Sequence, residues 1–297
     1  MQRIYTLLYL SLSLLFLACS SDDDGSEGIK PMHFVAIHPS AVSRADASGF
    51  ETGDCIGVFV TADTAALQVA GNKVSNEPLQ YDGRQWSARR QLYWDDGVYN
   101  VCAYYPHFVT VGSIDDLDVA VATDQSLGKG VHSSAATSAS LSAYEASDIL
   151  YARTEGVAAT DDAVPLRFVH TMSRLVIRLV KGEDYEGELP RSVDVYVHNT
   201  VPEATLNLHN GIVTKSIKAQ RHSIKARQES DYTYAAVIVP QRIANRVPLL
   251  EVDINGVSYL CEATFTFSPG MQHVVNFILD KNPEQSQITI GGEVSKW

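Results

Sequence analysis

Hydrophobic and polar positions alternate regularly in the second half of the sequence. In residues 174–180, Leu175, Ile177 and Leu179 recur at every second position, and residues 192–199 repeat the pattern with valine. Successive side chains of a strand point to opposite faces, so a period of two predicts strands with one buried face. Such runs recur at roughly ten-residue spacing, which predicts an antiparallel sandwich or barrel. The further runs are residues 205–214, 234–240, 249–263, 263–270, 273–279 and 287–294.

Two Asn-Gly pairs divide these runs. Asn210-Gly211 lies within residues 205–214, and Asn255-Gly256 lies within residues 249–263. A two-residue type I′ turn needs positive φ at both central residues, which Asn and Gly tolerate best. Each pair therefore predicts a tight hairpin turn.

The first half has a similar character but less regular alternation. Residues 32–38, 54–60 and 99–106 are strand candidates joined by longer polar stretches. Residues 126–147 indicate a surface loop, with one short helical turn at Leu141–Ala146. No segment shows a sustained helical period, so we expect an all-β fold.

The pattern changes near Asp161, Asp162 and Pro165, after which alternation is clean. We expect an N-terminal β-sandwich domain at residues 31–162 and a C-terminal β-sandwich domain at residues 163–297. Either domain has the size of a typical single β-sandwich.

Residues 1–18 have the layout of a secretory signal peptide. Arg3 gives a basic start, residues 7–18 are mostly apolar, and Ala18 is a small residue before Cys19. This run is shorter than the ~20 apolar residues that a transmembrane helix needs. A small residue followed by cysteine resembles a bacterial lipobox, in which the cysteine carries acyl chains such as palmitate. The alternative is an ordinary signal peptide with a chance cysteine.

Residues 19–30 are acidic and contain Gly and Ser, which predicts a solvated, flexible tether. In one group of gut and oral Gram-negative bacteria, cysteine followed by serine and three aspartates resembles the signal that directs lipoproteins to the outer surface.

The chain of 297 residues carries a net charge of −12, which argues against nucleic acid as a partner. Besides Cys19, it contains Cys55, Cys102 and Cys261, an odd number for an exported protein. Cys55 and Cys102 can form a disulfide if their strands are neighbours. The favoured reading for all three is a buried thiol that acts as a small hydrophobe.

Sequence motifs for catalysis are absent. There is no Gly-x-Ser-x-Gly, no phosphate-binding Gly-rich loop ending in Lys-Ser/Thr, and no His-Glu-x-x-His. His33 and His38 are five positions apart in one predicted strand and would face opposite sides. His170 is more typical of a packed or capping residue. We therefore expect no enzyme activity, no metal and no cofactor.

One basic cluster interrupts the acidic chain. Lys215, Arg221 and Arg227 surround an internal repeat of Ser-Ile-Lys-Ala at residues 216–219 and 223–226. The cluster is either a solvated strand face or a contact patch for an acidic surface such as a neighbouring subunit.

Several short stretches together resemble the fimbrillin (Mfa-like) family of lipoprotein pilus subunits. They follow the lipobox-like start in order and cover most of the mature chain. The resemblance implies two tandem antiparallel β-sandwich domains of the transthyretin-like, fimbrillin type. The stretches are residues 53–60, 99–106, 147–154, 168–179, 239–241, 267–279 and 288–297.

The resemblance also implies an assembly mechanism. In polymerising members, a trypsin-like protease cuts after an arginine in the first domain, the first strand leaves, and a neighbour donates a strand. Here the first strand is Met32–His38, and Arg44 with Ala45 resembles the processing site. The alternative is an ordinary loop arginine, because other relatives are never cut. Residues 287–297 are a possible donor strand or the last strand of the second domain, which we favour.

We expect a surface-exposed fimbrial subunit, or a fimbria-associated anchor or tip, attached to the cell outer membrane through Cys19. Its partners would be other fimbrial subunits and, in adhesion, a host surface or glycan. The alternative is a non-polymerising surface lipoprotein that binds glycan or a host protein. Trp86 and Trp94, with the neighbouring tyrosines, would supply the stacking surface, although aromatic residues within strands are more often core.

Overall fold

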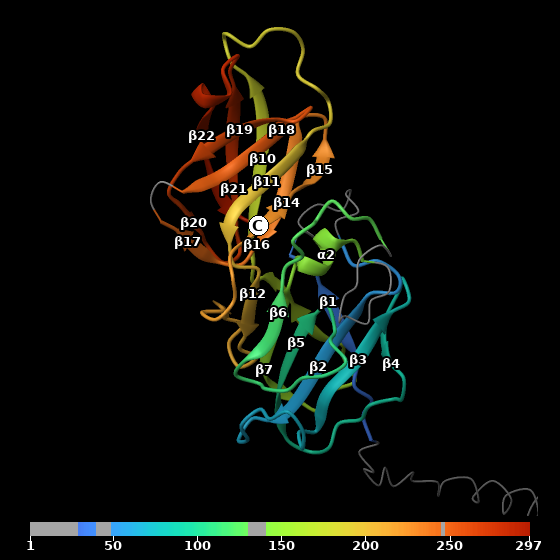
Figure 1. Cartoon of the computed structure of the whole chain (residues 1–297). Coiled ribbons are helices and arrows are strands. Elements are labelled where there is room, and N and C mark those ends of the chain that lie inside the picture. The colour runs from blue at the N-terminus through green and yellow to red at the C-terminus, as the bar shows by residue number, and fades with distance from the viewer. Residues whose placement is uncertain (1–28, 40–48, 130–140, 245–246) are drawn as a thin grey trace, which may run out of the picture.

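The computed structural model describes residues 29–39, 49–129, 141–244 and 247–297. Almost every element is a strand, so the predicted all-β fold is confirmed (Figure 1). The elements up to β9 are β1 Phe34–Ile37, β2 Cys55–Ala62, β3 Val74–Tyr81, β4 Trp86–Ala88, β5 Val98–Tyr105, β6 Leu117–Ala120, α2 Ala143–Ser147, β7 Leu150–Ala158, β8 Val164–Arg167 and β9 Val169–His170. The remaining elements are β10 Ser173–Lys181, β11 Asp194–Thr200, β12 Glu203–Leu206, β13 Val213–Lys215, β14 His222–Lys225, β15 Arg227–Ser230, β16 Thr233–Ile238, β17 Gln241–Ile243, β18 Pro248–Ile254, β19 Val257–Glu262, β20 Phe265–Phe267, β21 Met271–Leu279, the 3-10 helix η1 Pro283–Gln285 and β22 Gln287–Lys296.

The second half forms a two-layer sandwich. A five-stranded sheet in the order β15-β16-β10-β21-β22 packs on a four-stranded sheet in the order β14-β11-β18-β19. Ile177 and Phe277 from one sheet and Val197 and Val252 from the other belong to one buried cluster. The alternating positions predicted from the sequence therefore form the inner faces of this sandwich.

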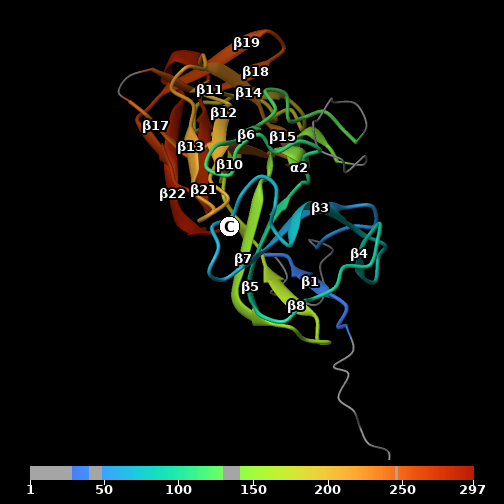
Figure 2. The same ribbon diagram turned by 90° about the horizontal axis from the view of Figure 1, so that it is seen from below.

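The region around the first-half strands has three layers rather than two, and strands β8, β9, β12 and β13 from the second half contribute to them. Its six-stranded sheet, in the order β4-β3-β2-β5-β7-β9, lies in the middle. The pair β1-β8 covers one face, where Val58 packs in a cluster with Phe34. The sheet β13-β12-β6 covers the other face, where Phe59 belongs to the same cluster as Leu206. The view in Figure 2 shows β1 and β8 at the side of the middle sheet away from β6, β12 and β13.

This layering explains the irregular pattern in the first half. Seven consecutive residues of β2, from Cys55 to Thr61, are buried. A strand covered on both faces has a continuous apolar run instead of alternation.

Among the described strands, two pairs are parallel and the other pairs are antiparallel. β1 runs parallel to β8, with Phe34 opposite Val164. β10 runs parallel to β21 over eight residue pairs. Parallel neighbours need a long crossover, and here the whole of β11 to β20 lies between β10 and β21.

We propose that the boundary between the N-terminal and C-terminal domains lies near residues 162 and 163. Three strand pairings cross that point: β1 with β8, β7 with β9, and β6 with β12. A division of the chain there would separate strands that share hydrogen bonds, so any two domains would remain closely joined.

The Asn255-Gly256 turn is confirmed. Ile254 pairs with Val257, and the two residues between them have φ of 54° and 81°. These are the positive values that a type I′ turn requires.

The prediction of a tight turn at Asn210-Gly211 is wrong. The flanking strands end at Leu206 and Val213, so six residues connect them. Leu208 in this connection is fully buried in the larger cluster, and the Tyr151 hydroxyl donates to its carbonyl at 3.0 Å. Burial of Leu208 outweighs the local preference of Asn-Gly for a two-residue turn.

No disulfide forms among Cys55, Cys102 and Cys261. The strands of Cys55 and Cys102 are neighbours, but Phe59 lies opposite Cys102. Cys55 and Cys102 are buried as expected, whereas Cys261 is half-buried. Burial raises the pKa of the Cys102 thiol to about 12, which keeps it protonated and unreactive.

The predicted helical turn is α2. The Ser142 hydroxyl accepts from the Glu145 backbone N–H at 3.2 Å, and Glu145 accepts from the Ser142 N–H at 2.8 Å. This reciprocal capping fixes the start of a helix too short to be stable alone. None of the helices in the described ranges is long and apolar enough to cross a membrane.

Candidate strand-exchange site

β1 lies as a separate strand between two other segments. We call the surface that holds it, made by residues 92–94 and 164–168, the β1 groove. Met32 and Phe34 are 5% and 7% exposed, so both side chains point into the smaller hydrophobic cluster. Val35, between Phe34 and the next inward position, is 42% exposed. The predicted strand is therefore present, and the structure shows that one of its faces is buried.

Main-chain hydrogen bonds hold residues 30–37 on two sides: residues 30–32, just before β1, bond on one side, and His33 with β1 bonds on the other. On one side, the Met32 N–H donates to Leu92 at 2.8 Å, and the Trp94 N–H donates to Lys30 at 2.9 Å. On the other side, the Val164 N–H donates to His33 at 2.9 Å, and further along the strand the Phe168 N–H donates to Ile37 at 3.0 Å. The β1 groove thus offers two unsatisfied edges if the strand leaves.

Side-chain burial stabilises β1 in this groove. Burial of one Met and one Phe contributes about 3–6 kcal/mol in transfer free energy. The Phe34 and Trp94 rings are also tilted against each other with centroids 6.4 Å apart. This burial free energy stabilises β1 in the β1 groove and comes from few side chains.

The sequence-predicted processing site follows β1 directly. Arg44 and Ala45 lie outside the described residues, as do Cys19 and the expected signal peptide at residues 1–18. The described residues that flank the Arg44 segment, His38 and Phe50, contact each other with ring centroids 5.0 Å apart.

The end of β1 enters a buried group of titratable side chains. His38 meets the His170 ring edge-on at 5.8 Å, and His170 Nδ1 lies 2.8 Å from Asp148 Oδ1. The pKa of His38 is lowered to about 4, chiefly by burial; Asp148 opposes this shift and His170 adds to it. Nearby, burial raises the pKa of the Asp54 carboxyl, although it accepts a hydrogen bond from Tyr105 at 2.9 Å. His170 is thus a packed residue, as the sequence indicated.

Trp297 joins the same group. Its ring stacks on His170 with centroids 4.0 Å apart and planes 6° apart. Sequence reasoning missed this contact, because nothing local links residues 127 positions apart. An aromatic last residue in a polar tail was the only available signal.

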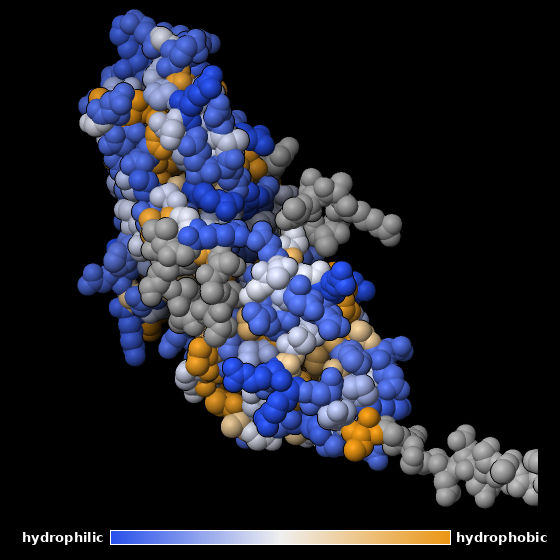
Figure 3. Space-filling view, turned by 90° about the vertical axis from the view of Figure 1, so that its right-hand side faces the viewer, coloured by the Kyte–Doolittle hydropathy of each residue, from blue (hydrophilic) through white to orange (hydrophobic). Residues whose placement is uncertain are grey.

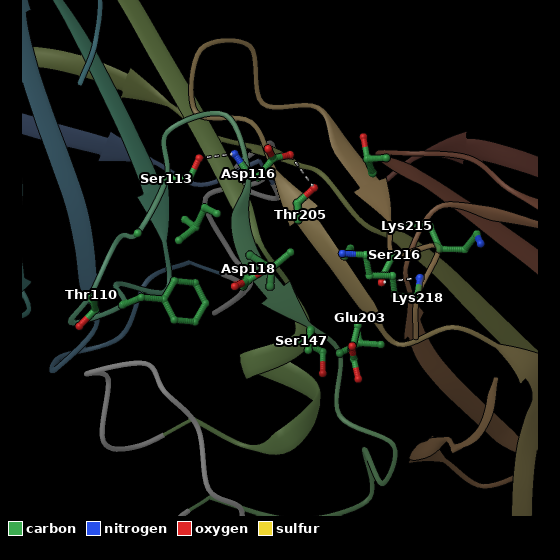
Figure 4. A pocket seen from close by; sticks show the side chains of 18 of the residues that line it. Thr110, Ser113, Asp116, Asp118, Ser147, Glu203, Thr205, Lys215, Ser216 and Lys218 are labelled. Carbon is green, nitrogen blue, oxygen red and sulfur yellow. Dashed lines mark hydrogen bonds between the residues drawn. The ribbon is translucent and has the colours of Figure 1, made fainter. Parts of the chain in front are cut away.

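A second candidate surface is a wide groove of about 1310 Å³ beside the edge strand β6 (Figure 4). Asp116, Asp118 and Glu203 line one part, and Lys215 and Lys218 line another. Asp118 on the edge strand and Asp116 just before it are exposed, and such charges protect an edge against pairing with other strands. This groove therefore fits strand exchange less well than the β1 groove.

The basic cluster predicted from the sequence divides into two places. Lys215 and Lys218 line the groove of Figure 4. Lys225 instead pairs with Asp194 at 2.7 Å, and Arg227 lies 3.8 Å over the Tyr144 ring. Lys225 and Arg227 therefore contact groups of this chain itself.

The tryptophans proposed for glycan stacking are core residues. Trp86 is 9% exposed and Trp94 is 3% exposed, and both belong to the smaller cluster. Trp86 stacks on Tyr81 with centroids 5.0 Å apart. Their rings have no free face for a sugar, so this assignment of the stacking residues is wrong.

Within the described ranges, no group of three or more His, Cys, Asp or Glu residues could hold a metal ion. The nearest arrangement to a catalytic one is a polar row on the outer face of the β14-β11-β18-β19 sheet. His198 Nδ1 lies 2.6 Å from Ser223 Oγ, and its Nε2 lies 2.7 Å from Glu251. Cross-strand neighbours on an open sheet face meet at such distances through register alone.

The comparisons with known proteins decide the family. The family model described as fimbrillin-like matches residues 43–297. The chain belongs to the fimbrillin-like family. No curated protein matched the sequence.

Solved structures share the fold of this fimbrillin-like chain. A proposed cell adhesion protein from Bacteroides ovatus superposes with a TM-score of 0.67 at 18% identity, covering 91% of this chain and 98% of its own. Another proposed cell adhesion protein, from Bacteroides uniformis, superposes with a TM-score of 0.65 at 17% identity, covering 92% of this chain and 99% of its own. A fimbrial protein from Bacteroides ovatus gives 0.51 at 18% identity, covering 85% of this chain and 49% of its own.

Proposed function

We propose that this protein is a surface-exposed fimbrial subunit, or a fimbria-associated anchor or tip, that assembles by exchange of strand β1. The fimbrillin-like family supports the fimbrial role, and the names of two similar structures support adhesion. The observation that carries the proposal is the position of β1 in the β1 groove. β1 is a short, separate strand with one buried face that pairs with β8, and residues 30–32 just before it bond to residues 92–94 on the other side.

Cleavage after Arg44 would leave residues 31–38 held by noncovalent contacts alone. A donor strand from a neighbouring subunit would then replace both rows of hydrogen bonds and fill the sites of Met32 and Phe34. An empty β1 groove would expose apolar side chains and two unpaired edges, which gives assembly its driving force.

The surface before exchange is consistent with this order of events. On the face shown in Figure 3, hydrophobic residues form small separate groups among hydrophilic ones. Removal of β1 would add the buried sites of Met32 and Phe34 to the exposed apolar surface.

The same proposal places Cys19 as the lipid attachment site and the outer membrane as the anchoring surface. Labelled palmitate should enter the wild-type protein in cells and should not enter a Cys19→Ser variant. Label in neither protein would exclude lipid anchoring without affecting the strand-exchange proposal.

Strand exchange is tested by treating the full chain with a trypsin-like protease that cuts after arginine. We expect a new N-terminus at Ala45 and higher-order species on size-exclusion chromatography. Arg44→Gln should remain intact at this position and monomeric. Arg84→Gln, which changes an exposed arginine elsewhere, is the matched control and should behave as wild type.

A synthetic peptide of residues 30–39 sharpens the experiment. Added in excess during cleavage, it should occupy the β1 groove and reduce assembly, whereas a peptide with Met32 and Phe34 replaced by Asp should not. A cleaved protein that stays monomeric without peptide would exclude β1 exchange and favour a non-polymerising module.

The role is inferred to be non-enzymatic. The polar row at His198 lies on an open sheet face, where a bound reaction intermediate would stay in contact with water. Recognition through strand edges and loops needs no bond-making chemistry.

A further inference from the structure

The layer that contains β1 turns one of its faces outwards. We call this outward surface, formed by residues 29–37, 89–93 and 161–169, the cover face. Figure 2 shows β1 and β8 at the side of the molecule away from β6, β12 and β13. Phe34 and Leu166 point into the smaller hydrophobic cluster, so the side chains next to them in each strand point away from it.

Four large hydrophobic side chains are exposed on the cover face. They are Ile29, Val35, Tyr93 and Val169, which are 76%, 42%, 45% and 55% exposed. Pro31 forms a bridge with Tyr93, and Pro165 lies opposite Val35, so further apolar residues lie between them. Single exposed apolar residues are ordinary, whereas a group of them on one surface indicates an interaction site.

The cover face is basic although the chain is acidic. The chain carries a net charge of −12, whereas the cover face contains more basic residues than acidic ones. The basic residues are Lys30, Arg89, Arg90 and Arg167, and the acidic residues are Asp161 and Asp162. The three arginines are exposed, and none of them has an ion-pair partner within the described part of the chain. Their guanidinium groups are therefore available to an anionic partner.

The chain enters the described structure on this face. The Trp94 N–H donates to the Lys30 carbonyl at 2.9 Å, so the first described residues lie beside Tyr93. Ile29 follows Cys19 by ten residues, and ten residues span at most about 36 Å when fully extended. If Cys19 carries acyl chains, as proposed above, the start of the cover face lies within this distance of the membrane.

This combination of side chains suits a membrane surface. Apolar and tyrosine side chains enter the boundary between headgroups and acyl chains, while arginines bind phosphate groups. Anionic lipids attract basic residues that lie within about a Debye length of the surface. The acidic body of a second copy has a complementary charge as well. The short link from Cys19 to Ile29 favours the membrane, because it holds the cover face near the anchor.

We propose that the cover face docks the uncleaved chain on the surface of an anionic lipid bilayer. Arg89 and Arg167 would contact headgroup phosphates, and Val35 and Tyr93 would enter the headgroup layer. The inference rests on the proposed attachment at Cys19. Cleavage after Arg44 would separate residues 29–37 from the rest of the chain, so docking belongs to the state before strand exchange.

The test uses the chain without residues 1–18 and with Cys19→Ser, so that no acyl chain contributes to binding. Co-sedimentation with vesicles of phosphatidylcholine and phosphatidylglycerol, at about 0.1 M salt, measures the partition of the protein. We expect binding that is at least tenfold weaker to vesicles of phosphatidylcholine alone. The paired change Arg89→Glu and Arg167→Glu should weaken binding to the anionic vesicles at least tenfold.

The matched control is the paired change Arg178→Glu and Arg242→Glu. These two arginines are exposed in the second half, and their replacement alters the net charge by the same amount. Binding of the control to the anionic vesicles should fall far less, because its substitutions lie outside the cover face.

The paired change Val35→Thr and Tyr93→Thr provides an independent variant if the charge-reversed protein does not fold. It should weaken binding several-fold, because it removes apolar side chains from the cover face. Ile212→Thr with Ile217→Thr replaces exposed apolar residues elsewhere and should bind as the parent chain does.

The proposal is overturned if the chain does not bind the anionic vesicles, or if it binds both kinds of vesicle equally. Equal effects of the two arginine pairs would also overturn it. Self-association that light scattering detects and that Arg89→Glu with Arg167→Glu abolishes would assign the cover face to a second copy instead. Palmitate labelling tests Cys19 separately, so failure of docking and failure of lipid attachment give different results.

Discussion

The middle sheet of the first half is buried on both faces, whereas each sheet of the sandwich in the second half is buried on one face. In β2, Val58 faces one buried cluster and the adjacent Phe59 faces the other. In β11, Val197 is buried while the adjacent Tyr196 lies on the outer face beside Lys225. Covering both faces adds core, but it requires separate segments, β1-β8 and β13-β12-β6, to supply the covers.

This difference explains why strand exchange is proposed for the first half. The proposal requires that the cover of two short strands loses β1 while the middle sheet stays in place. In the second half, each sheet is itself half of the core, and removal of a central strand would open the sandwich. The contrast can be tested by substitutions, starting with the largest expected effect.

Phe59→Ala should lower the free energy of unfolding by about 3–5 kcal/mol, because it removes a fully buried ring between the middle sheet and β12. Tyr196→Ala, on an outer face, should cost less than about 1 kcal/mol. Urea unfolding at equilibrium measures both values. Similar losses of unfolding free energy in the two variants would contradict the distinction between a sheet buried on both faces and a sheet buried on one.

Gly57→Ala should cost about 1–3 kcal/mol by overpacking. A Cβ at this position would lie 2.4 Å from Cε1 of the Tyr104 ring, which is fully buried above it. Tyr104→Leu in the same chain should recover part of the loss specific to Gly57→Ala, since it removes the atoms that clash. If the losses of the two single variants simply add in the double variant, the clash between the new Cβ and the Tyr104 ring is not the cause of the loss.

Lowering the pH should reduce the stability of the folded chain through His38, the residue that follows β1. Its pKa is about 4 in the folded chain and 6.5 in the unfolded chain, so between these values the unfolded chain binds more protons. The contribution of His38 to stability is present above pH 6.5 and is lost as the pH falls towards 4. His38→Phe keeps a ring against Phe50 without a titrating group.

The melting temperature should therefore fall by a few degrees between pH 7 and pH 5 in the wild type, and less in His38→Phe. Calorimetry at both pH values measures the difference. His209→Phe, remote from β1, should show the wild-type dependence. An equal fall in wild type and His38→Phe would mean that other groups cause it.

Gly256→Ala should cost about 1 kcal/mol, because its φ of 81° is unfavourable for a side chain although no atom lies within 4 Å of the new Cβ. Asn210→Ala should cost less than Asn255→Ala, since Asn210 does not have the positive φ that Asn255 has. Thermal unfolding of the three variants separates the tight turn from the longer connection. A larger loss at Asn210 would mean that its side-chain acceptance from the Ile212 N–H dominates.

Local patterns predicted part of the candidate site. The run Met32–His38 predicted a strand where β1 lies, and His170 was assigned as a packed residue. The partners of β1 were not predictable, because a parallel pair such as Phe34 and Val164 joins positions 130 residues apart. The aromatic content of Trp86 and Trp94 suggested a binding surface, but burial of their rings decides otherwise.

By itself, the sequence determined where most strands lie, that they form an all-β protein, and where the Asn255-Gly256 turn stands. These features depend on periodicity and backbone preference, which act over a few residues. Only the tertiary structure decided that the first half has a third layer, that Leu208 overrides a turn signal, and that His38, His170 and Trp297 meet. Such contacts join distant segments, and their stability comes from shared burial that no single stretch of the sequence contains.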